Sequence, residues 1–325
     1  MSDIKRNSAI TMQIIDPETF DDKEPITDLI SLVDKFLIIK TNSVYRVQLS
    51  EEIDKENIAP NTKSAYTKVL SVGSNNSCLL LGFIQFKSLV DFSKNKEKLL
   101  QHLWDTTQYL LMCEDSLKYM VKEINKRVSQ CYRVIEESKQ KTYISLPAVP
   151  SLDNHIAQFL INAKHCLINI FKEFNIMLKT PNKESNFEAY YKWFQDRKEQ
   201  YQEIYLTLKK DILWIKKISN LRNAIEHFCE GKKIETRNFT LLPGNKFMTP
   251  SWKYDLSSSG CGKQDNFSDL VNDMNVILNN ILSFQEDITV LCLNQELKDT
   301  NIGVRIFQNI KASPNGKGKF FLSRI

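Results

Sequence analysis

Residues 97–139 read EKLLQHLWDTTQYLLMCEDSLKYMVKEINKRVSQCYRVIEESK, and this stretch decides the fold. Its apolar side chains recur every three, four or seven residues, at Leu103, Leu110, Leu117, Met120, Ile124, Val128, Cys131 and Ile135. Such spacing places them on one face of a helix, which at about 1.5 Å per residue would extend over roughly 60 Å. The sequence therefore predicts one long amphipathic helix that ends before Pro147.

The same periodicity continues towards the C-terminus. We expect a second helix from Ser151 or Asp153 to about 179, a helical run over 185–229 that forms one helix or two, and a last helix over about 268–297. Between the last two, residues 234–256 hold β-capable runs around Leu242-Pro243-Gly244-Asn245, which is typical of a hairpin. The expected fold class is therefore mainly α, a helical bundle over 78–298 with a β-hairpin inserted before its last helix.

The N-terminal part has a different pattern. Residues 1–77 are expected to form a small mixed α/β lobe or arm. Within it we expect a polar segment up to residue 25, a short helix over Ile26–Val33, and strands over 35–40, 44–49 and 66–72. The C-terminal tail, 299–325, is polar and weakly basic.

The composition excludes several classes of protein. The apolar share of 42% and the charged share of 26% are those of a globular protein, and only 9 of the 325 residues are glycine, which argues against glycine-rich nucleotide loops. The 7 cysteines are odd in number and widely spaced, so neither a disulfide framework nor a zinc site is expected. We expect no cofactor and no metal ion. The net charge of +5 is too small to indicate a nucleic-acid partner by itself.

The same reading favours a cytoplasmic protein with no membrane segment. The N-terminus, MSDIKRNSAITMQ, lacks the apolar core of a signal peptide. The most apolar run, Cys78–Phe86, is far shorter than the roughly 20 residues that span a bilayer.

The residues with the most suggestive chemistry lie in WIKKISNLRNAIEHF, residues 214–228. Its apolar positions follow spacings of four and three and form the predicted buried stripe: Trp214, Ile218, Leu221, Ile225 and Phe228. At about 100° per residue, the opposite arc of the helix holds Arg222, Asn223, Glu226 and His227. An arginine can hold a phosphate through two hydrogen bonds, and a histidine can move a proton near neutral pH. The arc therefore suits phosphodiester chemistry, although its spacing also fits a solvated face with an Arg222–Glu226 pair at i,i+4.

Other patterns are weaker. Gly260-Cys261-Gly262-Lys263 is similar to the end of a phosphate loop, but the residues around it break the Walker pattern. The aromatic residues of 190–201 alternate with basic ones, as in some single-strand RNA binders, yet their helical spacing fits core burial better. His155 and His165 are not spaced as a helical metal pair, and His155 is expected to be a surface or capping residue.

The segment 214–228 resembles the signature of the HEPN superfamily. In that family an Arg, a polar residue and, a few positions later, a His lie near the start of a bundle helix, and Arg222, Asn223 and His227 match this order. The tryptophan, the Leu-Arg-Asn run and the aromatic residue after the histidine resemble one prokaryotic branch, the Cthe_2314-like HEPN proteins. The resemblance is close over about fifteen residues and looser over 97–297, and the motif here falls late in its helical run.

This resemblance implies a bundle that commonly forms homodimers, with a metal-independent endoribonuclease site shared between two protomers. RNA cleavage by 2′-OH attack would leave a 2′,3′-cyclic phosphate, and such enzymes serve as toxins, with an antitoxin as a possible partner, or in phage defence. Arg222 would clamp the phosphate, His227 would be the general acid/base, and Asn223 would orient the substrate or the histidine. Glu226 is added as a substrate-binding residue from its place on the helix alone. The alternatives are a non-catalytic HEPN-like module that binds nucleotide, RNA or protein, and a helical scaffold whose polar arc is only surface.

Overall fold

The computed structural model describes residues 23–324 apart from 57, 60, 139–142, 182, 184, 227–230, 300–303 and 309–319. Two compact units divide the chain, and the main boundary falls after Ile84, within α2 (Cys78–Val90). The fold is mainly α, as the sequence predicts, with the long helices in the second unit and small antiparallel sheets in both.

The first unit is a four-stranded antiparallel sheet. Its strands follow the chain in the order β1 (Ile26–Ser31), β2 (Phe36–Lys40), β3 (Val44–Gln48) and β4 (Ala65–Leu70), with the single turn α1 (Ser50–Ile53) before β4. The side chains of Ile38, Tyr45 and Val47 form its core. The strands expected over 35–40, 44–49 and 66–72 are confirmed.

The prediction of a short helix over Ile26–Val33 is wrong, because Ile26–Ser31 forms strand β1. Leu29 is exposed and Ile30 is buried, which is the alternation of a strand with one covered face. A segment this short gains little as an isolated helix, whereas pairing with β2 satisfies its backbone groups.

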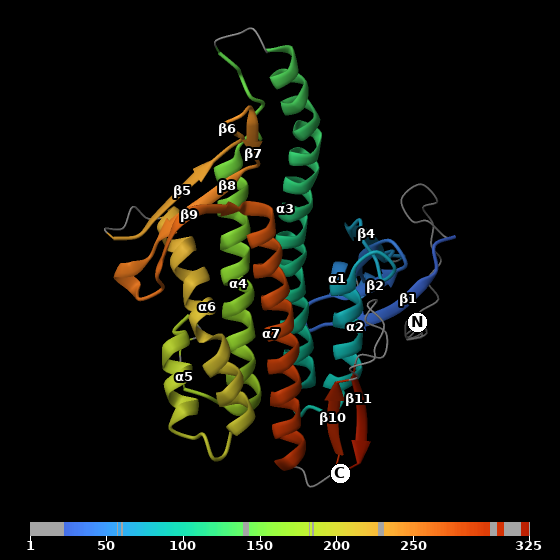
Figure 1. Cartoon of the computed structure of the whole chain (residues 1–325). Helices are drawn as coiled ribbons and strands as arrows, with labels where there is room; N and C mark the ends of the chain where they lie inside the picture. The colour runs from blue at the N-terminus through green and yellow to red at the C-terminus, as the bar shows by residue number, and fades with distance from the viewer. Residues whose placement is uncertain are drawn as a thin grey trace, which may run out of the picture. The chain divides into compact units, whose positions relative to one another are not determined.

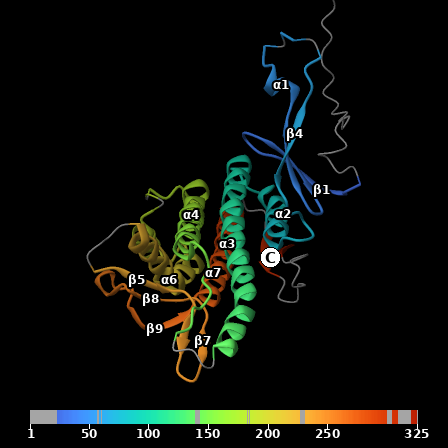
Figure 2. The same ribbon diagram turned by 90° about the horizontal axis from the view of Figure 1, so that it is seen from above.

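The second unit is a bundle built around α4 (Leu152–Leu178), which packs against α3 (Lys96–Glu137), α6 (Gln202–Glu226) and α7 (Leu270–Asp299) (Figure 1). The short helix α5 (Phe187–Gln195) packs against α6, so the run expected over 185–229 contains two helices. Figure 2 shows α3, α7, α4 and α6 as neighbours when they are seen from above. The bounds expected for the long helices are confirmed to within about three residues.

The predicted apolar stripes form the bundle core. On α4, Ile156, Phe159, Leu167 and Phe174 are fully buried, and on α3, Leu103 and Met120 are as well. Helix α7 is, among the described residues, the one helix that is long and apolar enough to cross a membrane by length and composition. Half of its most apolar 18-residue stretch is buried, and α7 packs against α3, α4 and α6. It is therefore a core helix of this bundle.

The insertion before α7 is larger than the expected hairpin. Strands β5 (Lys233–Arg237), β8 (Ser251–Asp255) and β9 (Lys263–Asp269) form an antiparallel sheet, and β6 (Thr240–Leu242) with β7 (Lys246–Met248) forms a hairpin at its tip. The predicted turn is present, with positive φ at Gly244 and Asn245. The residues of the tail expected to be merely polar include β10 (Val304–Gln308) and β11 (Phe320–Arg324), which pair with each other.

Candidate functional site

Helix α6 carries three of the predicted site residues, Arg222, Asn223 and Glu226, in the last two turns of its described part. Of the predicted stripe, Ile218 and Leu221 are buried, whereas Trp214 and Ile225 are half-buried. The described part of α6 is 25 residues long and ends at Glu226, so Arg222 and Asn223 lie about 20 residues after the start of the helix. This position departs from the HEPN pattern, in which the arginine lies near the start of its helix.

The described motif residues interact with one another. Arg222 forms an ion pair with Glu226 at i,i+4, and the Arg222 Nη1 atom donates to Asn223 Oδ1 at 3.3 Å. The Arg222 side chain is 23% exposed, so it is accessible to a ligand but not fully solvated. The predicted general acid/base, His227, lies outside the described residues.

A residue that the motif does not include joins this group from the neighbouring helix. Lys164 on α4 donates from Nζ to Asn223 Oδ1 at 3.1 Å, so one amide oxygen links a lysine and an arginine from two helices. Both Arg222 and Asn223 are therefore half-buried beside α4, not on a fully solvated arc. The helical wheel places residues on one helix correctly but contains no information about the helix beside it.

His165 follows Lys164 on α4 and packs against α3. Its ring stacks on Tyr109 of α3 with 5.1 Å between centroids and 17° between planes. His155 stacks on Tyr119 in the same way, at 4.0 Å. The two pairs show that α3 and α4 are antiparallel, because a step of ten residues up one helix matches ten down the other. His155 is thus a packing residue, and His165 is the histidine beside the candidate site.

The charges of this cluster act on one another. Burial lowers the pKa of Lys164, and the positive charges of Arg222 and Lys232 lower it further, while Glu226 opposes them. Burial also lowers the pKa of His165, again with contributions from Arg222 and Lys164. The cluster therefore gathers positive charge beside α6, and this charge disfavours protonation of the neighbouring His165.

Lys232 is held beside α6 by a second asparagine. Its Nζ donates to Asn220 Oδ1 at 2.8 Å, and Asn220 Nδ2 in turn donates to Cys261 Sγ at 3.1 Å. Asn220 and Asn223 are three residues apart, so they are neighbours on one side of the helix. Two asparagines of α6 thus fix two lysines that come from different segments.

The weaker sequence patterns have structural explanations. Lys263 of the loop that is similar to a phosphate loop forms an ion pair with Asp265 at 2.7 Å and lies in strand β9. Phe187, Tyr190 and Phe194 of α5 are buried, in line with core burial of the aromatic run. Among the described residues, no group of three or more His, Cys, Asp and Glu side chains is placed to hold a metal ion.

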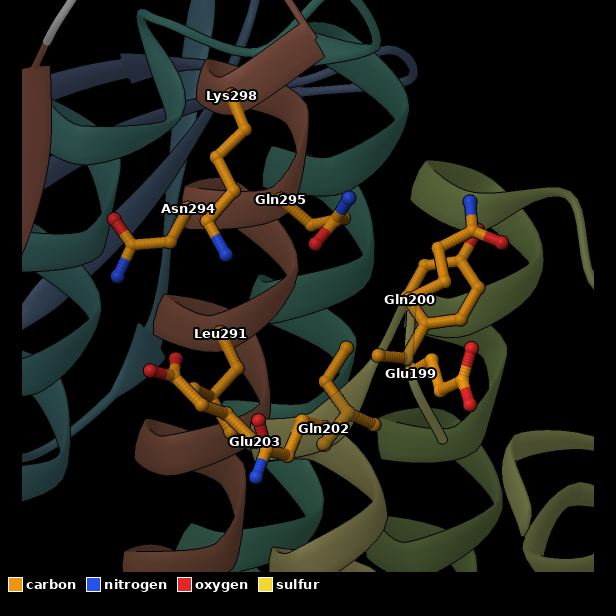
Figure 3. Close-up of a pocket in the computed structure, with 10 residues that line it drawn as sticks. Glu199, Gln200, Gln202, Glu203, Leu291, Asn294, Gln295 and Lys298 are labelled. Carbon is orange, nitrogen blue, oxygen red and sulfur yellow. The ribbon is translucent and has the colours of Figure 1, made fainter. Parts of the chain in front are cut away.

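A polar pocket of about 130 Å³ lies elsewhere, between the start of α6 and the end of α7. Figure 3 shows Glu199, Glu203, Gln295 and Lys298 among the side chains around it. Glu203 and Arg222 are separated by 19 residues of α6, or roughly 28 Å along the helix axis. The pocket is therefore separate from the cationic cluster.

Comparisons with protein-family models, with curated proteins and with solved structures gave no match. The function is therefore inferred from the residues of the chain and their geometry.

Proposed function

We propose that this chain is a metal-independent endoribonuclease of the HEPN type. The observation that supports this most is the junction at Asn223, whose Oδ1 accepts hydrogen bonds from both Arg222 and Lys164. It concentrates positive charge next to the position that the motif gives to the catalytic histidine. A phosphodiester is the substrate class that such a group of cations favours.

In the proposed reaction, His227 removes the proton from a ribose 2′-OH, whose oxygen attacks the adjacent phosphorus. A new P–O2′ bond forms, the P–O5′ bond breaks, and the leaving 5′-oxygen takes the proton back from the His227 imidazolium. Arg222 stabilises the additional negative charge on the phosphate oxygens, and Asn223 orients the substrate or the imidazole. The products are a 2′,3′-cyclic phosphate and a 5′-hydroxyl.

Glu226 has a defined role in this proposal. It forms the ion pair with Arg222 in the absence of RNA, and the phosphate competes with it for the guanidinium. This competing role replaces the substrate contact that its place on the helix alone suggested. A homodimer would supply a second copy of the same residues to one cleft. The biological setting that we propose is a toxin or a phage-defence effector acting on cytoplasmic RNA, with an antitoxin as a possible partner.

The decisive experiment is RNA cleavage by the purified protein in EDTA. We expect cleavage products with 2′,3′-cyclic phosphate ends, and we expect His227→Ala to abolish them without lowering the melting temperature. His155→Ala is the matched control, since it removes a histidine that packs on Tyr119 away from the motif. Cleavage by His227→Ala at the wild-type rate would overturn the proposal.

The second candidate is a non-catalytic HEPN-like module that binds RNA or nucleotide. The observation in its favour is that Arg222 already has a carboxylate partner in Glu226. RNA binding without any cleavage, unchanged by His227→Ala, would identify this alternative.

A further inference from the structure

The lysines beside the motif point to a second part of the RNA site. Lys164 from α4, Arg222 from α6 and Lys232 from the segment before β5 carry three positive charges, and the charges of Arg222 and Lys232 both act on Lys164. Among the described residues, Glu226 is the one carboxylate whose charge acts on Lys164 or His165. The described cluster therefore keeps an excess of positive charge in a half-buried place.

The cations are fixed in position before any ligand arrives. The side chains of Lys164 and Lys232 are each held by an asparagine of α6, at 3.1 Å and 2.8 Å. Holding like charges together costs free energy, which a bound anion would recover. Asparagine is suited to this, because its oxygen accepts from the cation without neutralising the charge.

Asn223 adds a hydrogen-bond donor to the same place. Its Oδ1 atom accepts from Lys164 and Arg222, and the Nδ2 atom of the same amide carries two N–H donors. A phosphate oxygen is an acceptor that lysine, arginine and amide donors can contact together. Neither lysine belongs to the Arg–Asn–His motif, so this placement extends the site onto α4 and the β5 side.

We propose that Lys164, Arg222 and Lys232 form a phosphate cradle that holds the RNA backbone beside the bond to be cut. The proposal rests on the proposed function, which supplies the RNA. Arg222 serves the reacting phosphate, and the two lysines hold the neighbouring backbone. The lysines are thus substrate-positioning residues.

The test measures binding separately from cleavage. The probe is a labelled 12-nucleotide RNA with 2′-O-methyl riboses, which lacks the attacking hydroxyl, and its affinity is measured over a range of salt concentrations. Each phosphate contact contributes about 0.7 to the salt slope for single strands. We therefore expect Lys164→Gln and Lys232→Gln each to lower the slope by about 0.7 and the affinity at 0.1 M salt by about fivefold.

Two further variants distinguish a phosphate contact from a structural role. Lys164→Arg keeps the charge and should restore the wild-type slope. Lys118→Gln removes an equivalent charge on α3, where the lysine pairs with Glu114, and should leave the slope unchanged. A slope that is unchanged when Lys164 and Lys232 are both replaced by glutamine would overturn the cradle, as would failure of the wild-type protein to bind both this probe and a nucleoside 5′-monophosphate.

A nucleoside 5′-monophosphate is the second probe. If it binds in a Lys164-dependent manner while the 12-nucleotide RNA does not, the cradle takes free phosphate esters and the RNA assignment is wrong. The cradle and the nuclease can also fail separately. A lower slope in the lysine variants without cleavage of unmodified RNA would support the cradle alone, whereas His227-dependent cleavage with an unchanged slope would support the nuclease alone.

Discussion

Helix α4 carries ionisable side chains in two places, and the two environments treat charge in opposite ways. Glu173 faces α7, is fully buried, and accepts a hydrogen bond from Thr289 Oγ1 at 2.7 Å. Lys164, nine residues earlier, is half-buried and shares Asn223 with Arg222. The first, the sealed place, is closed off by the bundle, while the second, the open cluster, is partly exposed to solvent.

The two environments differ in how they affect the ionisation of Glu173 and Lys164. Burial raises the pKa of Glu173 to about 8, so the carboxyl is mostly neutral at pH 7, although the Thr289 hydrogen bond opposes the shift. In the open cluster, the positive charges of Arg222 and Lys232 act on Lys164, and Glu226 supplies the opposite charge. A fully buried carboxyl is thus neutralised by its surroundings, whereas side chains that are partly exposed keep a charge that can attract a ligand.

The largest effect that we expect comes from the open cluster. Arg222→Ala should reduce RNA cleavage on the order of 10³-fold, because the transition-state phosphate loses its main positive partner. Its melting temperature should change little, since the arginine is surface-accessible. Arg197→Ala is the control, since that guanidinium lies over Trp193 on α5. A large stability loss with unchanged specific activity would contradict the contrast between the two places.

The next effect tests the sealed place through pH. The folded-state pKa of Glu173, about 8, lies above the ordinary value of 4.5, so the folded protein holds a proton that the unfolded chain releases. The stability contributed by this proton is complete below pH 4.5 and is lost as the pH rises to about 8, by roughly 1.4 kcal/mol per pH unit.

Glu173→Gln should therefore be more stable than the wild-type protein at pH 8 and close to it at pH 4.5. Urea unfolding at a series of pH values measures the difference. Parallel stability curves for the two proteins would show that Glu173 does not titrate in this range.

A smaller effect tests the hydrogen bond inside the sealed place. Thr289→Val keeps the shape but removes the donor to Glu173, whose Oε1 has no hydrogen-bond partner among the described residues. We expect a loss of about 1–3 kcal/mol in the free energy of unfolding at pH 6, measured with denaturant. Thr106→Val is the matched control, because that buried hydroxyl bonds a carbonyl of its own helix. Equal losses in the two variants would mean that Glu173 gains nothing specific from Thr289.

The two places on α4 also differ in how much of them could be predicted from the sequence. The stripes on α3, α4 and α7 follow from periodicity, because a helix buries one face wherever it packs. The pairing of Lys164 with Asn223 could not be predicted, since it depends on which turn of α4 lies against which turn of α6. The prediction of a helix over Ile26–Val33 is wrong for the same reason, because Ile26–Ser31 becomes a strand by pairing with β2. Local pattern gives the elements, and contacts between elements create the cluster.

The smallest expected effect reports on the open cluster directly. Burial, Arg222 and Lys164 lower the pKa of His165, so removing one cation should raise it. Arg222→Gln should shift the midpoint of the His165 imidazole titration, followed by NMR, upwards. Saturating 2′-O-methyl RNA should move the wild-type midpoint in the same direction, because phosphate offsets the surrounding positive charge. A midpoint unaffected by either change would place His165 outside the field of the cluster, and the charge excess there would then have no consequence for its neighbours.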